Sequence, residues 1–255
     1  MEHSTELKAA LEAAEAAARV IREHYARAVE ARLKSDGSPV TDADVAAEQA
    51  IRAVLEARCP GSAFFGEETG RHGGEGPLWL VDPIDGTKAF VRGYPMFSTQ
   101  IALLREGELV LGVSSAPLYG ELAFAERGRG AWLNGRPLRV SAIARLEDAA
   151  LSTGNLKTLA RSPAWARLGA LVARVNRIRG YGDFLHYHLL AGGRIDAVVE
   201  SDVNILDIAA LVPLVEEAGG RFTALDGAKV GLATTTVLAS NGALHEAVRA
   251  ALAWG

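Results

Sequence analysis

The chain contains the stretch Trp79-Leu80-Val81-Asp82-Pro83-Ile84-Asp85-Gly86-Thr87-Lys88, in which two carboxylates follow an apolar run and a turn follows the carboxylates. Leu80 and Val81 favour a strand, whereas Pro83 and Gly86 force a turn. A helix that begins near Thr87 would offer unpaired backbone N–H groups to an anion. Acidic side chains and an anion-binding turn are therefore expected at one point of the fold.

The sequence before this stretch predicts two helices and two short strands. Apolar residues between Leu7 and Tyr25 recur at spacings of three and four, which predicts a long amphipathic helix. Thr41 is a typical N-cap for a second helix that runs toward Leu55. Short strands are expected over 63–65 and 78–81, on either side of a glycine-rich loop.

After residue 88 the sequence pattern changes twice, first to one typical of strands and then to alternating strands and helices. β-Branched and aromatic runs broken by glycine predict an antiparallel sheet, with strands near 99–104, 108–114, 122–126 and 137–141. From residue 150 onward, strands expected over 150–152, 176–179 and 195–200 alternate with helices over 159–172, 183–191 and 207–218. This alternation predicts an α/β fold in the second half of the chain.

Composition narrows the classes of function. The 255 residues are 49% hydrophobic, and the formal net charge of −4 is spread without any run of Lys or Arg. We therefore expect a compact protein that binds no nucleic acid. Cys59 is the only cysteine, no apolar run approaches the roughly 18 residues of a membrane-spanning helix, and the polar N-terminus resembles no signal peptide. No membrane partner is expected, and the cytoplasm is the expected compartment.

Carboxylates at the ends of predicted elements form the candidate metal site; they are Glu67, Asp82, Asp85 and Asp207. Two like charges about 4 Å apart cost about 4 kcal/mol at an effective dielectric near 20, so convergence of these groups requires a cation. No His or Cys lies in these segments, and a ligand set of oxygen atoms favours Mg²⁺, with Mn²⁺ as the second choice. The backbone carbonyl of Ile84 could complete the coordination.

A phosphoryl group fits between such a cation and the N–H groups of Gly86 and Thr87, which leads to the hypothesis of a phosphomonoesterase that uses metal-activated water. Structural explanations compete for each acid alone: Asp85 suits a turn, Asp207 a helix start, and Asp44 a capping box with Thr41. A phosphatase with an aspartyl nucleophile would need an acid two residues before Asp85, where Pro83 stands. His24, His72, His186 and His188 form no ligand pattern and are expected to be structural or surface residues.

Three ordered motifs resemble the signatures of the inositol monophosphatase family: Gly66–Thr69, Trp79–Thr87 and Leu206–Ala210, the last followed by Glu216–Gly220. The resemblance runs from about Val40 to Thr223. It implies an αβαβα five-layer sandwich of the inositol monophosphatase and fructose bisphosphatase type. It also implies a homodimer that hydrolyses small phosphomonoesters with two or three Mg²⁺ ions.

The resemblance also implies roles for individual residues. The metal ligands would be Glu67, Asp82, the Ile84 carbonyl, Asp85 and Asp207, and phosphate would bind at Gly86 and Thr87. Asp44 would pair with the Thr87 hydroxyl, and these two would orient the attacking water together with Glu67. One residue departs from the family pattern, because Leu206 stands where the family usually has Trp.

The substrate is predicted from further resemblances. Lys88–Gly93 and Arg179–Asp183 resemble the histidinol-phosphate phosphatase branch, and Glu200 matches a family position that contacts the leaving alcohol. Asp183 and Glu200 suit a cationic or polyhydroxylated leaving group, so histidinol phosphate is the first candidate and inositol monophosphate the second. Phosphoadenosine phosphate and fructose bisphosphate remain alternatives within the family. A non-catalytic regulator that senses metal or phosphate is the alternative of another class.

The predicted domain organisation divides the chain into two halves. Residues 1–141 would form an α+β half with most of the metal ligands, and residues 142–255 an α/β half with Asp207 and the substrate contacts. Because no flexible linker separates the halves, we expect one compact unit with the active site between them.

Overall fold

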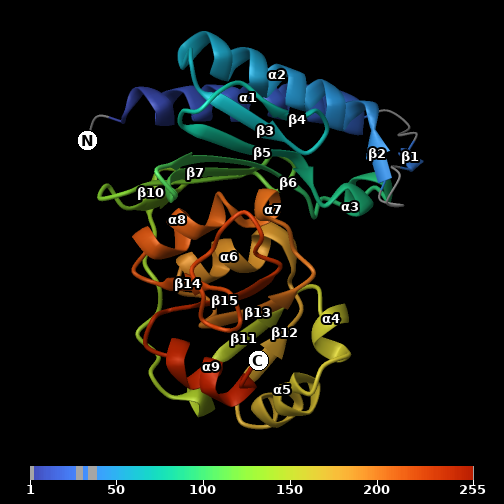
Figure 1. Ribbon diagram of the computed structural model, residues 1–255. Coiled ribbons are helices and arrows are strands. Elements are labelled where there is room, and N and C mark those ends of the chain that lie inside the picture. Colours follow the sequence, from blue (N-terminus) through green and yellow to red (C-terminus); the bar gives the residue numbers. More distant parts are fainter. Residues whose placement is uncertain (1–2, 27–30, 34–38, 255) are drawn as a thin grey trace.

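Layers of helices alternate with β-sheet in the computed structural model, which describes residues 3–26, 31–33 and 39–254 (Figure 1). From one end of the molecule to the other, the order is helices, large sheet, helices, small sheet, helices. Apolar cores fill the spaces between successive layers, and one of them continues around the middle helices from the large sheet to the small sheet. The predicted αβαβα architecture is confirmed.

The first layer consists of α1 (Thr5–Tyr25) and α2 (Asp42–Arg58), the two helices predicted at the start of the chain. The buried face of α1 is rich in alanine, and small side chains let a neighbouring helix and sheet approach closely. Thr41 is the N-cap of α2, as predicted, and accepts a hydrogen bond from the Ala43 N–H at 3.2 Å. Before α2, a short ribbon pairs β1 (Ala31–Leu33) with β2 (Pro39–Thr41).

The large sheet has the strand order β10-β9-β8-β7-β6-β5-β3-β4, and all its pairs are antiparallel except β3 with β5. Its strands are β3 (Ala63–Gly66), β4 (Gly70–His72), β5 (Leu78–Asp85), β6 (Ser98–Arg105), β7 (Glu108–Ala116), β8 (Glu121–Glu126), β9 (Ala131–Leu133) and β10 (Arg136–Pro137). The strand predicted over 137–141 is wrong: strand pairing ends at Pro137, the Leu138 N–H makes one more bond to the Ala131 carbonyl, and the chain then leaves the sheet, where the Val140 N–H donates to the Ala218 carbonyl. β4 and β9 were not predicted.

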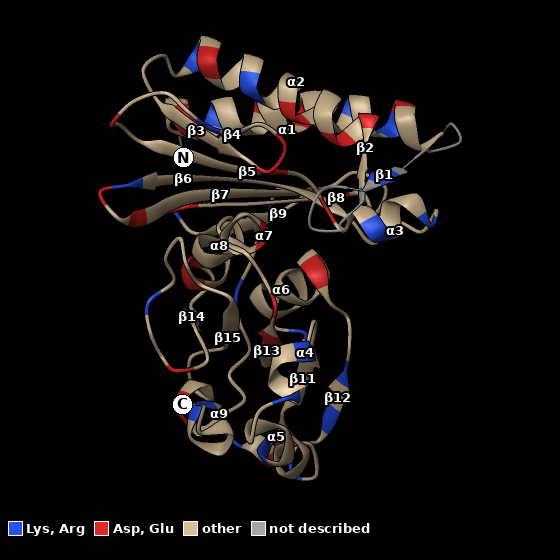
Figure 2. Cartoon of the chain, turned by 45° about the vertical axis from the view of Figure 1, so that its right-hand side comes forward, with Lys and Arg blue, Asp and Glu red and all other residues tan. Residues whose placement is uncertain are grey.

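The middle layer contains α6 (Asp183–Ala191), α7 (Ile205–Ile208) and α8 (Leu211–Glu217), which both Figure 1 and Figure 2 place between the sheets. The helix predicted over 207–218 therefore begins earlier and is broken, because Pro213 cannot donate a hydrogen bond back into the preceding turn. This layer touches the backbone of the large sheet: a Cβ on Gly112 of β7 would lie 2.1 Å from the Ala210 carbonyl oxygen.

The small sheet has the order β12-β11-β13-β15-β14, in which β11 is parallel to β12 and β13, and β15 is antiparallel to both of its neighbours. Its strands are β11 (Ala150–Thr153), β12 (Arg177–Arg179), β13 (Ala197–Ser201), β14 (Arg221–Thr223) and β15 (Thr236–Ser240). The helix predicted over 159–172 is divided at Pro163 into α4 (Lys157–Ala160) and α5 (Ala164–Val172). A 3-10 turn, η1 (Leu146–Asp148), precedes the sheet.

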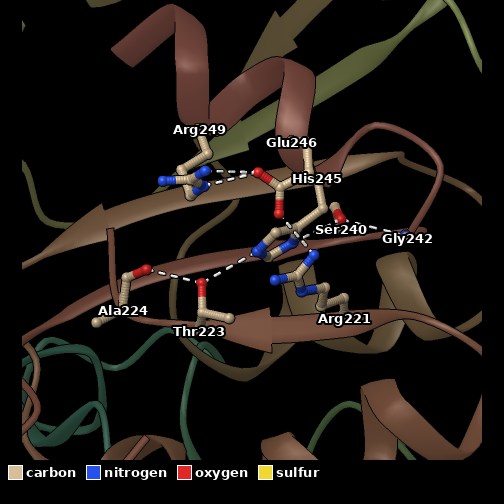
Figure 3. Close-up of polar contacts among 8 residues, drawn as sticks. All are labelled: Arg221, Thr223, Ala224, Ser240, Gly242, His245, Glu246 and Arg249. Carbon is tan, nitrogen blue, oxygen red and sulfur yellow. Dashed lines mark hydrogen bonds and ion pairs between the residues drawn. The ribbon is translucent and has the colours of Figure 1, made fainter. Parts of the chain in front are cut away.

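The last layer packs α5 and α9 (His245–Leu252) against the small sheet, where His245 is fully buried (Figure 3). Its Nε2 lies 3.0 Å from Thr223 Oγ1, and its Nδ1 lies 3.0 Å from Ser240 Oγ. Thr223 donates its hydroxyl proton to the Ala224 carbonyl, so it must accept from His245 Nε2, which assigns the proton of the neutral imidazole to Nε2. Burial lowers the pKa of His245 to about 4, and the positive charge of Arg221 acts in the same direction.

Acidic and basic residues are interspersed along the described chain (Figure 2). Within residues 3–26, 31–33 and 39–254, no helix is long and apolar enough to span a membrane.

Candidate active site

Three carboxyl groups converge where β5 ends. Asp82 and Asp85 come from β5, and Asp207 comes from α7, which packs against that strand. One oxygen atom from each of the three lies within 4.8 Å of the others. The pairing of β5 with β6 shifts register between Asp82 and Asp85, and such an irregularity lets both acids face the same point.

The end of β5 is fixed by local hydrogen bonds. The Ile84 N–H donates to Asp82 Oδ1 at 2.9 Å, and the Thr99 hydroxyl donates to the Pro83 carbonyl at 2.8 Å. Gly86 then turns the chain with φ of +93°, into α3 (Thr87–Val91). A Cβ at Gly86 would lie 2.6 Å from the Met96 carbonyl oxygen, so this turn requires glycine.

Asp207 is held by the helix that carries it. Asn204 is the N-cap of α7, and its backbone N–H and side-chain amide donate to the Asp207 carboxylate at 2.9 and 2.6 Å. Asp207 is thus the third residue of the helix, whereas the sequence predicted it at the first. Both its structural explanation, as a capping residue, and its convergence with Asp82 and Asp85 hold at once.

Glu67 lies in the turn between β3 and β4. Its backbone N–H donates to the Val81 carbonyl at 3.1 Å, which fixes the turn beside β5. Its side chain shares a hydrogen bond with Asp82, so it lies at the same cluster. A cavity of about 410 Å³ lies beside Glu67, and its lining mixes apolar residues such as Leu206 and Leu232 with polar ones such as Asn204 and Thr234.

Burial and mutual repulsion make this cluster electrostatically unfavourable without a cation. Burial raises the pKa of Asp82 well above its ordinary value, and the charge of Glu67 raises it further. The pKa of Asp85 is raised well above its ordinary value by burial and then by the charge of Asp183. Burial also raises the pKa of Asp207 to about 7, although the hydrogen bond from the Asn204 N–H opposes that shift.

These residues suit a hard divalent cation. Among the residues that the structure describes, no Lys, Arg or His forms an ion pair with Asp82, Asp85 or Asp207. Clustered oxygen donors without a basic partner are what Mg²⁺ or Mn²⁺ requires. The Ile84 carbonyl lies between two of these acids in sequence and accepts a hydrogen bond from the Thr87 hydroxyl at 3.0 Å.

Asp44 and Thr87 meet beside this cluster. The Thr87 hydroxyl lies 3.2 Å from Asp44 Oδ1, so its single proton can go either to that carboxylate or to the Ile84 carbonyl. Asp44 Oδ2 accepts hydrogen bonds from the N–H and the hydroxyl of Thr41 at 2.7 and 2.6 Å. The capping box expected for Asp44 and its contact with Thr87 are therefore made by different oxygen atoms of one side chain.

Glu200 and Asp183, the predicted substrate contacts, lie near one another. Glu200 is buried at the end of β13, where it accepts hydrogen bonds from the Asn155 N–H at 3.0 Å and the Tyr187 hydroxyl at 2.9 Å. Burial raises the pKa of Asp183 to about 6, and the charge of Glu200 also raises it. Asp183 is the first residue of α6 and has a positive φ of 45°, so its side chain lies at the N-terminus of that helix.

Two buried groups near the site were missed by the sequence analysis. His186 is fully buried, and its Nε2 lies 3.2 Å from the Glu200 carboxylate. Glu48 is also fully buried and bonds to the turn that carries Glu67. The sequence position of Glu48 could have indicated its burial, because Asp44 and Glu48 occupy the same face of α2 as the buried Ile51 and Leu55. Acidic side chains on a buried face require hydrogen-bond partners.

Comparisons with known proteins agree with this site. The model of the inositol monophosphatase family matches residues 2–254. The chain is 45% identical over 221 residues to the histidinol-phosphatase of Mycobacterium tuberculosis, covering 84% of this chain and 85% of that protein. It is 36% identical over 247 residues to the inositol-1-monophosphatase of Caulobacter vibrioides, covering 92% and 96%. The extragenic suppressor protein suhB of Bartonella henselae superposes with a TM-score of 0.91 at 34% identity, over 99% of this chain and 100% of that one.

Proposed function

This chain belongs to the inositol monophosphatase family and is a phosphatase, and from that premise we propose that it is a Mg²⁺-dependent enzyme that hydrolyses a small phosphomonoester by direct attack of water. The convergence of Asp82, Asp85 and Asp207 within 4.8 Å carries the proposal. Oxygen ligands at this density are stable as carboxylates only beside a cation. The Gly86–Thr87 turn follows directly, at the place where a phosphoryl group would meet backbone N–H groups.

Each part of the site would have a separate task. Asp82, Asp85, Asp207, Glu67 and the Ile84 carbonyl would hold the divalent cations. A cation bound there polarises the phosphoryl group and lowers the pKa of water, so that hydroxide is available at neutral pH. Gly86 and Thr87 would orient the phosphoryl oxygens.

Asp44, Thr87 and Glu67 would together orient the attacking water. When the Thr87 hydroxyl donates to Asp44 at 3.2 Å, the lone pairs of its oxygen are free to accept a hydrogen bond from water. Glu67 is the second acceptor for that water. Asp44 therefore acts through Thr87 and orients its hydroxyl.

The leaving group is proposed to be cationic, with histidinol phosphate as the first candidate. Asp183 and Glu200 put negative charge beside Asp85, and two carboxylates favour an ammonium or imidazolium group. The likeness to histidinol-phosphatases supports this choice. Inositol monophosphate is the second candidate, supported by relatives of that name.

A phosphate-release assay with Mg²⁺ tests the proposal on histidinol phosphate, inositol monophosphate, fructose bisphosphate and phosphoadenosine phosphate. We expect the highest kcat/KM on histidinol phosphate and no release after Mg²⁺ is chelated. Binding without release on every substrate would favour a non-catalytic regulator. A covalent aspartyl phosphate trapped during turnover would contradict direct attack by water.

The family resemblance further supports a homodimer, and the lone Cys59 supports a reducing compartment such as the cytoplasm. Light scattering coupled to gel filtration would measure the first, and microscopy of a fluorescent fusion the second.

A further inference from the structure

Glu48 on α2 is a fully buried carboxylate. Its relative exposure is 0%, and within the described residues no Lys, Arg or His pairs with it. In the described part of the chain, its hydrogen bonds all come from the turn between β3 and β4. It accepts from the Glu68 N–H at 2.8 Å, from the Thr69 N–H at 2.9 Å and from the Thr69 hydroxyl at 2.6 Å.

Burying a carboxylate without a cation destabilises the folded protein, so its presence here calls for an explanation. An ionised carboxylate loses several kcal/mol of solvation on burial, and hydrogen bonds to the charged form offset that loss only in good geometry. An apolar side chain at this position of α2 would pack beside Ile51 without that cost. What the carboxylate adds is a fixed backbone at Glu68 and Thr69, since both N–H groups are bonded to one rigid planar group.

The turn is shaped to receive this carboxylate. A Cβ on Gly66 would lie 2.4 Å from the Glu48 carboxyl carbon, so the absence of a side chain at Gly66 gives the carboxylate its place. Gly66, Glu68 and Thr69 all adjoin Glu48. Glu67, between them, is the residue whose side chain shares a hydrogen bond with Asp82.

The turn is held from both sides. Glu48 bonds it on the side of α2, and the Val81 carbonyl accepts the Glu67 N–H at 3.1 Å on the side of β5. Val81 directly precedes Asp82. The distance between Glu67 and the metal-binding end of β5 is thus set by two anchors, of which one is the Glu48 side chain.

We propose that Glu48 is a positioning residue for the cation site: it fixes the Gly66–Thr69 turn so that the Glu67 carboxylate faces Asp82. The inference rests on the proposed function for the presence of a cation. It adds that the affinity of this cation depends on a carboxylate that does not touch it. Residues that orient ligands in this way typically change metal affinity by about 10- to 100-fold when they are replaced.

The test measures Mn²⁺ binding to purified metal-free protein by calorimetry and by electron paramagnetic resonance of the free ion. In Glu48→Gln, one amide N–H must face the N–H of Glu68 or Thr69, so one anchor of the turn is lost. We expect Mn²⁺ to bind about 10-fold or more weakly. Glu56→Gln is the matched control, because Glu56 lies on the same helix and is exposed, and we expect wild-type affinity from it.

A second pair of variants covers the case in which Glu48→Gln does not fold. Thr69→Val removes the hydroxyl bond of 2.6 Å and keeps the N–H, so Mn²⁺ affinity should fall, whereas Thr69→Ser keeps both and should bind as wild type does. A merely structural role would lower Tm in Glu48→Gln or Thr69→Val and leave the Mn²⁺ affinity of the folded protein unchanged. That result would overturn the proposal.

Failure of the proposed function gives a different pattern. If wild-type protein binds Mn²⁺ but releases no phosphate from any substrate, the phosphatase proposal fails for those substrates, and weaker binding by Glu48→Gln still supports the positioning role. If wild-type protein binds no Mn²⁺, both proposals are overturned.

Discussion

Replacing Asp85 with Asn should stabilise the metal-free protein while it abolishes most activity. No residue in the described chain donates a hydrogen bond to the Asp85 carboxylate, so the substitution removes charge and no such contact. Two unit charges at 4.8 Å repel by about 3.5 kcal/mol at an effective dielectric near 20, and Asp85 has two such neighbours, Asp82 and Asp207. Full ionisation of all three acids would therefore place about 7 kcal/mol of repulsion on Asp85, and protonation of the cluster relieves part of it.

The direction of the effect follows from the raised pKa of Asp85. Burial raises that pKa well above its ordinary value, and the charge of Asp183 raises it further, so the charged form is disfavoured in the folded protein. The Asn side chain carries no charge, and we therefore expect metal-free Asp85→Asn to be more stable than wild type at about pH 7.5. For a chain of this size, each kcal/mol gained raises Tm by about 2 to 4 °C.

Differential scanning fluorimetry in EDTA and in Mg²⁺ is the assay. Wild-type protein should gain stability with Mg²⁺, by about 2.7 kcal/mol at about 100 times Kd, whereas Asp85→Asn should gain much less. Glu75→Gln is the control, since it removes the same charge from an exposed position and should leave both Tm values unchanged. A metal-free Asp85→Asn that melts below wild type, or that gains as much from Mg²⁺ as wild type does, would refute this reasoning.

Three further predictions concern other layers. Gly112→Ala should destabilise the protein by about 1 to 3 kcal/mol in urea denaturation, because its Cβ would lie 2.1 Å from the Ala210 carbonyl oxygen. Gly154→Ala places a Cβ 2.0 Å from Glu200 Oε1, so kcat/KM for the preferred substrate should fall about 10-fold or more while Mn²⁺ affinity stays unchanged. His245 has a pKa of about 4 when folded and about 6.5 when unfolded, so the unfolded state binds more protons between these values. Stability should fall by up to about 1.4 kcal/mol per pH unit as pH drops through this window, and His245→Gln should show a smaller slope.

The glycine predictions share one control. A Cβ at Gly74 would have no heavy atom within 4 Å, and the φ of Gly74 is ordinary, so Gly74→Ala should change neither stability nor kcat/KM. If Gly112→Ala and Gly74→Ala have the same free energy of unfolding, the helices of the middle layer must shift to accommodate the added methyl group at no cost in stability. An unchanged kcat/KM in Gly154→Ala would show that Glu200 does not contact the substrate. A pH slope in His245→Gln equal to that of wild type would assign the slope to other groups.

Local signals predicted the first two helices well, because periodicity marked α1 and the Thr41 cap marked α2. α6 was predicted from the alternation of strands and helices in the second half of the chain. The errors lie where long-range pairing decides the outcome. The strand expected over 137–141 has a β-prone composition, but after Leu138 the chain leaves the sheet and Val140 bonds to Ala218 instead. β9 forms from only three residues, which pair with β8. α7 and α8 were predicted as one helix because the break depends on Pro213 within an otherwise helical pattern.

The convergence of distant acids could be anticipated because each stands beside a turn or an element end. The buried residues that support these acids could not be predicted in the same way. Glu48 and His186 reach the site from within a helix, so their partners become evident only when α2 lies beside β3 and α6 beside β13. Asn204 was also missed, because a cap is recognised only after the helix start is known, and that start was placed too late.

Asp44 and Asp207 each close a capping box and also face the acidic cluster. These two roles matter when the sequences of diverged relatives are used to infer activity. A descendant that lost catalysis would still be under selection to keep both acids, since its helices begin with them. The Asp85 carboxylate closes no capping box and accepts no hydrogen bond from the residues that the structure describes. Among relatives that retain Asp44 and Asp207, the residue at the position of Asp85 should therefore be the better marker of whether the protein still works as an enzyme.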